Sequence, residues 1–335
     1  MQTLIISAGE AGQRFDKFLG KYFRDASAGF LYKMLRKKNI TLNGRKAAGS
    51  EILKEADEIA VFMSDETIRK FRGVSVRTEE PGTFVPDVLF RSRDILVLNK
   101  PAGMLVQPGN TSEPSVADHL PGWMLEHGYL SEEELRAFRP APANRIDRNT
   151  SGIVLCGTSY AGLRVLSEII RNGALKKSYF VLTAKTDLKD GVYTAWARKK
   201  AAGNMMEVKD APEPGYARMV TGLTAVCHGR SLSLLRIELI TGRTHQIRAH
   251  LGHLGAFVAG DRKYGSAPLN RKLASAYGVN RQLLHACEAV FPPEAAEKCE
   301  FPPGGRVRAP LPGDFLRVLK GEDMIIPEGF AHPGA

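Results

Sequence analysis

The residues with the clearest chemical potential lie in the stretch NRIDRNTSGIVLCG, residues 144–157. A single carboxylate, Asp147, stands between Arg145 and Arg148, directly before a Thr-Ser-Gly turn and an apolar run. Arginine stays charged at any working pH, and a nearby cation favours the ionised carboxylate, so Asp147 is suited to nucleophilic work rather than to proton donation. The alternative interpretation is a solvated Arg-Asp-Arg cluster on a surface loop.

Other kinds of site find little support in the sequence. His245, His250 and His253 are spaced by five and three residues, so the His-x-x-x-His pair that binds zinc on one helix face is absent. We expect no metal, and these histidines fit helix packing or phosphate contacts instead. The G-x-S-x-G elbow of hydrolases and the glycine fingerprints of nucleotide sites are also absent. A glycosidase would normally need a second carboxylate on the other side of the glycosidic bond, and the glycine-bounded motifs of this chain offer arginines and a tyrosine instead.

Composition indicates a polyanionic partner. The 335 residues carry 47 Lys+Arg against 36 Asp+Glu, a net charge of +11, and the pI is about 9.5. The four cysteines form no Cys-x-x-Cys pair, which favours a reducing cytoplasm. No apolar run approaches the roughly 20 residues of a membrane span, so we expect a cytoplasmic protein that does not enter membranes.

The chain is long enough for two domains, and its first 65 residues are strongly basic. Apolar spacing predicts helices over 13–23 and 28–38, followed by a strand at 40–42, an Asn-Gly turn and a strand at 59–62. Residues 11–48 contain ten Lys/Arg and two acids. Such a cluster of basic residues would bind RNA phosphates independently of the nucleotide sequence. The alternative is a solvated helix face without a ligand. The candidate RNA-binding residues are Arg14, Lys33, Arg36, Lys37, Lys38 and Arg45.

After a predicted linker at 66–87, strand patterns dominate. Buried strands are predicted at 95–98, 153–157 and 180–182, weaker ones at 191–197, 216–226 and 231–240, and a late one at 283–291. Helices are predicted near 115–128, 160–172 and 314–320. Because strands and helices do not alternate, we expect an α+β fold with a mixed, largely antiparallel sheet over 88–320, followed by a tail at 321–335.

Two resemblances sharpen this interpretation. RFDKFL followed by LYKMLRKKNITLNGRK resembles the small S-four-like RNA-binding module. NRIDRNTSG, KKSYFVLT, ITGRTHQIRAHLGHLG and GDRKYG, in this order, resemble the RluA-type pseudouridine synthases. The likeness runs from about residue 94 to the LLHA segment and on to APLPGDF. Within that family the RluC- and RluD-like branches carry the RNA-binding module, and they act on uridines of large-subunit ribosomal RNA.

The resemblance implies a role for several residues. Asp147 would be the catalytic aspartate, Arg145 would help to displace the target base, and Tyr179 would stack on the flipped uracil. Arg243 would form the ion pair with Asp147. Further candidates for substrate binding are Arg148, Thr150, His245, Gln246 and Arg248. Uridine isomerisation involves no net redox change, so we expect no cofactor. The sequence does not choose between attack on the sugar and a glycal route.

The sequence also departs from the family pattern. Asn144 and Ile146 replace the usual His and Leu before the aspartate, and Phe291-Pro292-Pro293 replaces a later His-Pro. Ile146 is an apolar exchange, whereas Asn144 could change the hydrogen bonds of the loop. We also keep plainer interpretations open: Tyr179 as a core residue of its strand, and Arg243 as a phosphate contact at a helix start.

The leading hypothesis is therefore a monomeric RNA pseudouridine synthase. One rival is an RNA-binding or ribosome-assembly factor without catalysis, which would release no tritium from uridine labelled at carbon 5. A second rival is a pseudouridine synthase that modifies transfer RNA. The target base must leave its stack before reaction, which costs a few kcal/mol and favours loops over duplexes.

Overall fold

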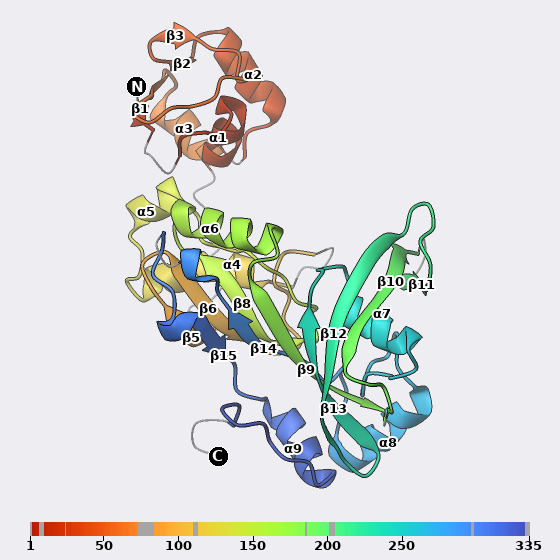
Figure 1. The fold of residues 1–335 in the computed structure, drawn as a ribbon. Helices are drawn as coiled ribbons and strands as arrows, with labels where there is room; N and C mark the ends of the chain where they lie inside the picture. Colours follow the sequence, from red (N-terminus) through yellow and green to blue (C-terminus); the bar gives the residue numbers. More distant parts are fainter. Residues whose placement is uncertain are drawn as a thin grey trace. The chain divides into compact units, whose positions relative to one another are not determined.

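The computed structural model describes residues 2–6, 10–23, 25–72, 84–109, 113–184, 186–200, 205–295 and 298–331. The chain forms two compact units, and each has its own sheet (Figure 1). The first unit contains Met1–Phe84 together with Asp118–Pro140 and Thr158–Ala161, and the second contains the rest. Residues 73–83 of the predicted linker and 332–335 of the predicted tail lie outside the described residues.

The N-terminal part of the first unit is a small antiparallel sheet. Its strand order is β1 (Gln2–Ile5), β4 (Glu58–Val61), β2 (Ile40–Leu42) and β3 (Arg45–Lys46). Asn43 and Gly44 join β2 to β3 with φ values of 51° and 70°. A two-residue hairpin loop of type I′ has positive φ at both positions, and Asn-Gly tolerates it best. This confirms the predicted turn.

Helices α1 (Phe15–Tyr22), α2 (Ala28–Arg36) and α3 (Asp65–Arg72) pack with that sheet. The first two match the predicted helices, and the Ser27 hydroxyl begins α2 by accepting from the Phe30 N–H at 3.2 Å. Helix α3 covers the start of the stretch that we expected to be a linker. It is mostly polar, but Ile68 is buried and the Phe71 ring lies 4.2 Å from that of Phe30, so two apolar residues one turn apart dock it on the core.

The second unit is built on an eleven-stranded sheet that confirms the α+β class. All strand pairs described are antiparallel except that of β14 with β8. The path is β11-β10-β12-β13-β9-β14-β8-β6-β5, with β15 beside β14 and β7 beside β8. The strands are β5 (Asp87–Arg91), β6 (Ile95–Lys100), β7 (Ala141–Pro142), β8 (Ser151–Gly157), β9 (Lys176–Ala184), β10 (Gly191–Lys199), β11 (Met206–Lys209), β12 (Ala217–His228), β13 (Leu232–Leu239), β14 (Leu284–Val290) and β15 (Arg306–Arg308).

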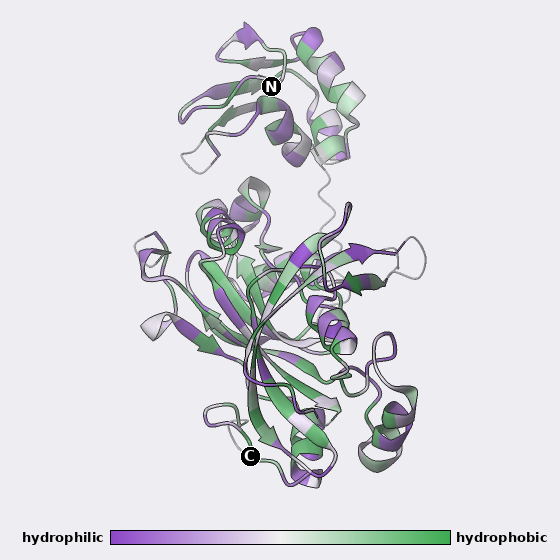
Figure 2. Cartoon of the chain, turned by 45° about the vertical axis from the view of Figure 1, so that its right-hand side comes forward, coloured by the Kyte–Doolittle hydropathy of each residue, from purple (hydrophilic) through white to green (hydrophobic). Residues whose placement is uncertain are grey.

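The centre of this sheet is apolar, as Figure 2 shows by the green of its middle strands. Every residue of β8 is buried, which explains its unbroken apolar sequence. Gly152 lies where β8 meets β14, with φ of +107°, and a Cβ there would lie 2.2 Å from the Ala286 carbonyl oxygen. Only glycine allows this approach.

Six further helices are described. They are α4 (Val116–Glu126), α5 (Glu132–Ala137), α6 (Tyr160–Arg171), α7 (Gln246–His253), α8 (Ala267–Tyr277) and α9 (Gly313–Gly321). Two 3-10 turns lie at Pro293–Ala295 and Pro303–Gly305. A capping box of Ser131 and Glu134 begins α5. Helix α8 had no counterpart in the sequence prediction, since only Leu273 of its residues is buried. None of the described helices combines the length and apolarity that a membrane crossing requires.

The end of the chain packs on the back of the sheet. Phe315, Val318 and Leu319 of α9 are buried against β9, β13 and β14 in one core. Met324 and Phe330 belong to the same core, although they lie in the segment expected to be a tail. The residues after α9 are therefore part of the second unit up to the end of its description.

Candidate active site

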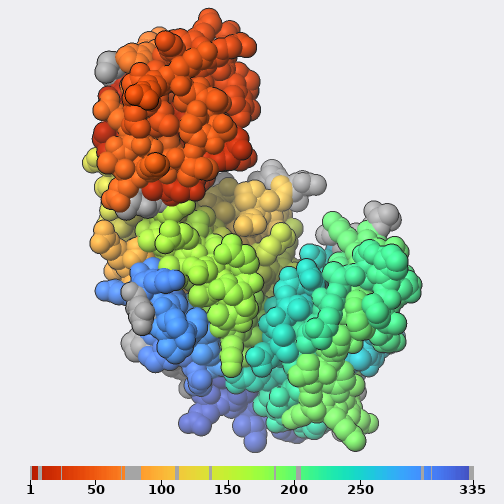
Figure 3. Space-filling view, turned by 45° about the horizontal axis from the view of Figure 1, so that its top comes forward, coloured from red at the N-terminus to blue at the C-terminus, as the bar shows by residue number. Residues whose placement is uncertain are grey.

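A pocket in the second unit collects most of the residues predicted to act on substrate. It is lined by Arg145, Ile146, Asp147, Thr150, Tyr179, Leu239, Arg243, His245, Gln246, Ile247, Arg248 and Leu284. These come from the loop before β8, from β9 and β14, from the end of β13, and from the turn before α7 and the first turn of that helix. Figure 3 shows the surface of this unit hollowed between its yellow-green and its cyan segments, which supply the two sides of the pocket. Residues about 100 positions apart in the sequence therefore meet around one small space.

The catalytic candidate Asp147 is about one quarter exposed, and its carboxylate is held by Arg248. The Arg248 Nη1 donates to Asp147 Oδ2 at 2.8 Å. The sequence predicted Arg243 as this partner, and that pairing is wrong. The Arg243 side chain instead donates from Nε to the Arg218 carbonyl at 3.3 Å and is exposed at the pocket wall.

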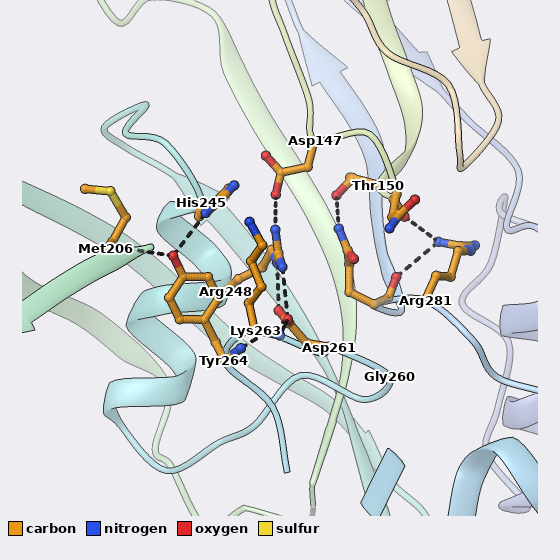
Figure 4. A network of polar contacts seen from close by, with 12 residues as sticks. Asp147, Thr150, Met206, His245, Arg248, Gly260, Asp261, Lys263, Tyr264 and Arg281 are labelled. Atoms are coloured by element: carbon orange, nitrogen blue, oxygen red, sulfur yellow. Dashed lines mark hydrogen bonds and ion pairs between the residues drawn. The ribbon is translucent and has the colours of Figure 1, made fainter. Parts of the chain in front are cut away.

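Behind Arg248 lies a second carboxylate that was not among the predicted site residues. Asp261 is fully buried and accepts from Arg248 Nε at 2.7 Å and from Nη2 at 2.9 Å, so the guanidinium fork bridges two aspartates (Figure 4). Burial by itself raises the pKa of Asp261, but the hydrogen bonds and charge of Arg248 outweigh it and hold that pKa below its usual range. The motif GDRKYG contains this residue, but nothing in the motif marks it as a partner of α7.

The loop that carries Asp147 is also tied down from other directions. The buried Lys100 ammonium donates to the Arg148 carbonyl at 3.0 Å, and to two carbonyls of its own loop. Arg281 donates to the Asn149 carbonyl at 3.2 Å, while the Gln282 amide donates to the Thr150 hydroxyl at 3.4 Å. Because these bonds end on the backbone and on Thr150, they fix where the loop presents Asp147 without using its carboxylate.

Tyr179 lies on β9, and it lines the pocket although it is only 5% exposed. Burial, and next the negative charge of Asp147, raise the pKa of the Tyr179 hydroxyl above its usual value. The ring therefore keeps its proton and offers an apolar face and a neutral hydroxyl beside the carboxylate. Both the core interpretation and the pocket interpretation of this residue describe part of its environment.

The turn that leads into α7 is organised by Gln246. Its buried amide bonds the Thr241 hydroxyl, the Arg243 N–H, the Val220 carbonyl and the Thr221 hydroxyl, at 2.8 to 3.1 Å. Gln246 thus reaches the pocket wall with its amide occupied by protein groups. The turn it shapes sets the direction of Arg243 and of the helix that presents Arg248.

The three histidines of this segment bind three different groups. His245 Nδ1 lies 3.0 Å from the Tyr264 hydroxyl, His250 Nδ1 lies 3.0 Å from the Thr221 hydroxyl, and His253 Nε2 lies 2.7 Å from an Asp210 oxygen. In the described part of the chain, no cluster of three or more His, Cys, Asp or Glu side chains is arranged to hold a metal ion.

Of the remaining residues near Asp147, one lines the pocket and the others bond to neighbouring parts of the protein. Arg145 is exposed and lines the pocket. Arg148 turns away from it, donating to the Gly103 carbonyl at 2.9 Å and pairing with Glu113 at 2.7 Å. Asn144, the departure from the family pattern, accepts from the Leu155 N–H at 2.7 Å and donates to the Ile153 carbonyl at 3.4 Å. Its amide therefore extends the pairing of β7 with β8.

The basic residues predicted to bind RNA are all exposed in the first unit. They are Arg14, Lys33, Arg36, Lys37, Lys38 and Arg45. Arg14 pairs with Asp16 at 2.7 Å, so one of these charges is locally neutralised. Lys33, Arg36 and Lys37 occupy the last turn and the end of α2, where they also complement the helix dipole.

Comparison with known proteins places this geometry in context. The family model for RNA pseudouridylate synthase matches residues 94–253, a range that includes Asp147, Tyr179 and Arg248. An uncharacterized RNA pseudouridine synthase of Mycoplasma genitalium is 31% identical over 299 residues, covering 87% of this chain and 88% of the relative. The chain belongs to the RNA pseudouridine synthase family. This pseudouridine synthase is also 29% identical, over 96% of each chain, to ribosomal large subunit pseudouridine synthase C of Escherichia coli (strain K12).

The fold agrees with this assignment. The solved structure of human RNA pseudouridylate synthase domain containing 4 has a TM-score of 0.58 to this pseudouridine synthase. It is 20% identical in sequence, and the match covers 72% of this chain and 95% of that one. The enzyme is accordingly an isomerase of uridines in RNA, of the RluA type that its motifs indicated.

Proposed function

We propose that this enzyme converts uridines of large-subunit ribosomal RNA to pseudouridine, with Asp147 as the catalytic residue. The observation that carries the proposal is the position of the Asp147 carboxylate. It lies in the pocket that Tyr179 also lines, and Arg248 donates to it at 2.8 Å. Support for the substrate comes from relatives named ribosomal large subunit pseudouridine synthase C, matched along 96% of both chains.

Isomerisation breaks the bond between ring nitrogen and sugar, turns the base, and rejoins it through carbon 5. A carboxylate can serve either by attacking the anomeric carbon or by removing a proton from the neighbouring sugar carbon. In both routes Arg248 orients the Asp147 oxygens, and Tyr179 gives the flipped uracil a flat apolar surface. Arg145, exposed at the pocket, supplies a cation for the strand from which the base has been displaced.

The exposed basic residues of α1, α2 and β3 are proposed to bind RNA phosphates as an S-four-like module. Clustered cations contribute affinity that is independent of sequence and weakens with salt. We place this module at residues 1–65 with α3 docked on it, the linker in the part of 66–87 after that helix, and the catalytic domain from residue 88 through the segment that packs on its core after α9. We also propose a monomer in the cytoplasm, in keeping with four cysteines that are all free.

Pseudouridine mapping across total RNA tests the substrate. Cells with the wild-type enzyme, cells lacking it, and cells carrying Asp147→Ala are compared. We expect one or more large-subunit positions to lose pseudouridine in the last two strains alone. Loss confined to transfer RNA would replace the proposed substrate, and an unchanged map would contradict catalysis.

A further inference from the structure

The wall of the pocket contains a chain of hydrogen bonds that links the Met206 backbone and the Tyr264 hydroxyl to His245. The Met206 backbone N–H, at the start of β11, donates to the Tyr264 oxygen at 2.7 Å. The same oxygen lies 3.0 Å from His245 Nδ1 (Figure 4). A backbone N–H can only donate, so Tyr264 accepts from Met206 and has its own proton available for the histidine.

The surroundings of Tyr264 keep that proton on its oxygen and hold the tyrosine ring beside His245. Burial raises the pKa of Tyr264, so its hydroxyl stays protonated. The Arg248 guanidinium lies 5.4 Å from the Tyr264 ring centre, and the His245 ring meets it edge to face at 5.7 Å. With the hydroxyl donating, His245 Nδ1 is an acceptor, and the ring proton resides on Nε2.

The ring is also held neutral. Burial lowers the pKa of His245, and the charged groups that face it come from four places: Asp147 raises that pKa, Arg248 and Lys263 lower it, and Asp261 raises it. Opposite charges are thus paired around the imidazole, and desolvation decides the direction. A neutral imidazole with Nδ1 occupied presents a single N–H donor.

The backbone of His245 adopts an unfavourable conformation. His245 precedes α7 with φ of 52° and ψ of 21°, in the left-handed region, and its side chain makes no capping bond to the helix. Such a conformation costs a non-glycine residue on the order of 1 kcal/mol. The imidazole of this residue lines the pocket, so a residue with a costly backbone conformation lies at the site.

We propose that His245 donates its Nε2–H to an acceptor oxygen of the flipped uridine, and that Tyr264 is the positioning residue that locks this tautomer. The inference rests on the pocket being the site of uridine isomerisation. Uracil offers two carbonyl oxygens and the ribose a hydroxyl, and each accepts a hydrogen bond. A fixed donor would favour a carbonyl over an amino group, as needed to distinguish uridine from cytidine.

The tautomer can be measured without substrate. In the full-length protein labelled with ¹⁵N-histidine, two-dimensional NMR distinguishes a protonated ring nitrogen from an acceptor nitrogen. His245→Gln identifies the signals by their disappearance. At pH 7.5 we expect His245 to have a protonated Nε2 and an unprotonated Nδ1. A proton on Nδ1, or a doubly protonated ring, would overturn the proposal even if catalysis by Asp147 holds.

Tyr264→Phe removes the hydroxyl that fixes the ring. We expect His245 to populate both tautomers in this variant and kcat/KM on a large-subunit RNA transcript to fall roughly tenfold. Tyr193→Phe is the matched control, because Tyr193 lies on β10 outside the pocket and its hydroxyl donates to the Lys189 carbonyl just before that strand. A Tyr264→Phe enzyme that keeps one Nε2–H tautomer and full activity would contradict the role of Tyr264.

Modified RNAs identify the oxygen. The target uridine is replaced by 2-thiouridine, 4-thiouridine or 2′-deoxyuridine, and binding is compared between wild type and Tyr264→Phe. If the difference in RNA affinity between the two enzymes disappears with one of the thiouridines, the acceptor is the base oxygen that sulfur has replaced. If it disappears with 2′-deoxyuridine, the acceptor is the ribose hydroxyl. A difference that persists undiminished with all three RNAs would refute donation to the nucleoside.

Discussion

At the scale of single residues, the site depends on one guanidinium shared by two carboxylates. Arg248 is 7% exposed and joins Asp147 at the pocket to Asp261 in the interior. The planar guanidinium can donate to both carboxylates at once, whereas a lysine ammonium would provide a single point charge. Asp261 therefore orients the Arg248 guanidinium and, through it, the Asp147 carboxylate, although Asp261 does not line the pocket.

Asp261→Asn tests this arrangement. Removing one charge of a buried pair should lower the free energy of unfolding by about 3 kcal/mol. It should also lower kcat by at least roughly tenfold, since the Asp147 oxygens lose their fixed direction. Urea unfolding and tritium release measure the two effects. Asp210→Asn is the control, because that side chain is 87% exposed and its pair with His253 contributes little. Equal effects in the two variants would contradict the bridge.

At the scale of elements, the catalytic loop is placed by the parallel pairing of β8 with β14. Ser151 and Gly152 pair with His285 and Ala286, directly after the loop of Asp147. In Gly152→Ala, the new methyl group would overlap the Ala286 carbonyl in a left-handed conformation. We expect a loss of roughly 2–5 kcal/mol in stability.

The loss should appear in thermal or urea unfolding, together with reduced turnover. Gly313→Ala at the start of α9 is a matched control, since a Cβ there meets nothing within 4 Å. If Gly152→Ala were as stable as this control, the close approach of the two strands would be wrong.

His285 joins the same two strands in the interior. Its Nδ1 lies 3.0 Å from the Ser151 hydroxyl, and its Nε2 lies 3.2 Å from the Ala309 carbonyl. Burial lowers the pKa of His285 to about 4, against roughly 6.5 in an unfolded chain. The unfolded state therefore binds the proton first, so this contribution to stability is complete above about pH 6.5 and is lost as the pH falls towards 4.

We accordingly expect the stability difference between wild type and His285→Gln to shrink by about 2 kcal/mol on acidification from pH 7 to 5, because this window covers about 1.5 of the roughly 2.5 pH units that separate the two pKa values. Urea unfolding across this range gives the two curves. Buried His250 contributes in the same direction to both proteins, so it cancels in the comparison. Parallel curves would show that the protonation of His285 is not linked to folding.

At the scale of the whole molecule, the excess positive charge is concentrated in the N-terminal segment, apart in sequence from the candidate catalytic residues. Ten Lys/Arg against two acids in residues 11–48 give that segment +8 of the net charge of +11. Replacing Lys33, Arg36 and Lys37 by glutamine should reduce the slope of log affinity against log salt by about 2–3 if each contacts a phosphate. Filter binding to a large-subunit transcript at several salt concentrations measures it.

The control replaces Arg271, Lys272 and Lys320 by glutamine, three exposed cations on α8 and α9. We expect their slope to match wild type. Equal slopes for the two triple variants would mean that α2 does not bind the RNA backbone.

Features encoded by local pattern and by motifs could be predicted from the sequence. Asp147, Tyr179 and the turn before α7 were identified in this way, and the hairpin at Asn43-Gly44 was predicted because that turn has a conformational cause. The sequence could not reveal that Arg248 rather than Arg243 meets Asp147. Which arginine of that turn faces the aspartate depends on the left-handed backbone of His245 and on a buried carboxylate thirteen positions beyond Arg248.

Long-range support was invisible for the same reason. The bonds of Lys100, Arg281 and Gln282 to the catalytic loop span 48 and 132 positions. Helix α3 was missed because it docks by two apolar residues in an otherwise polar segment. Contacts of this kind arise from tertiary packing, and no local spacing in the sequence encodes them.

The central claim is that the Asp147 carboxylate carries out the isomerisation, and Asp147→Asn tests it most directly. Asp261 still neutralises Arg248 in this variant, so the fold should persist and RNA binding should stay within a few-fold of wild type. Tritium release from RNA labelled at carbon 5 of uridine is measured with both enzymes. We expect rapid release by the wild type and none by Asp147→Asn. Release by the variant at a rate comparable to wild type would contradict the claim.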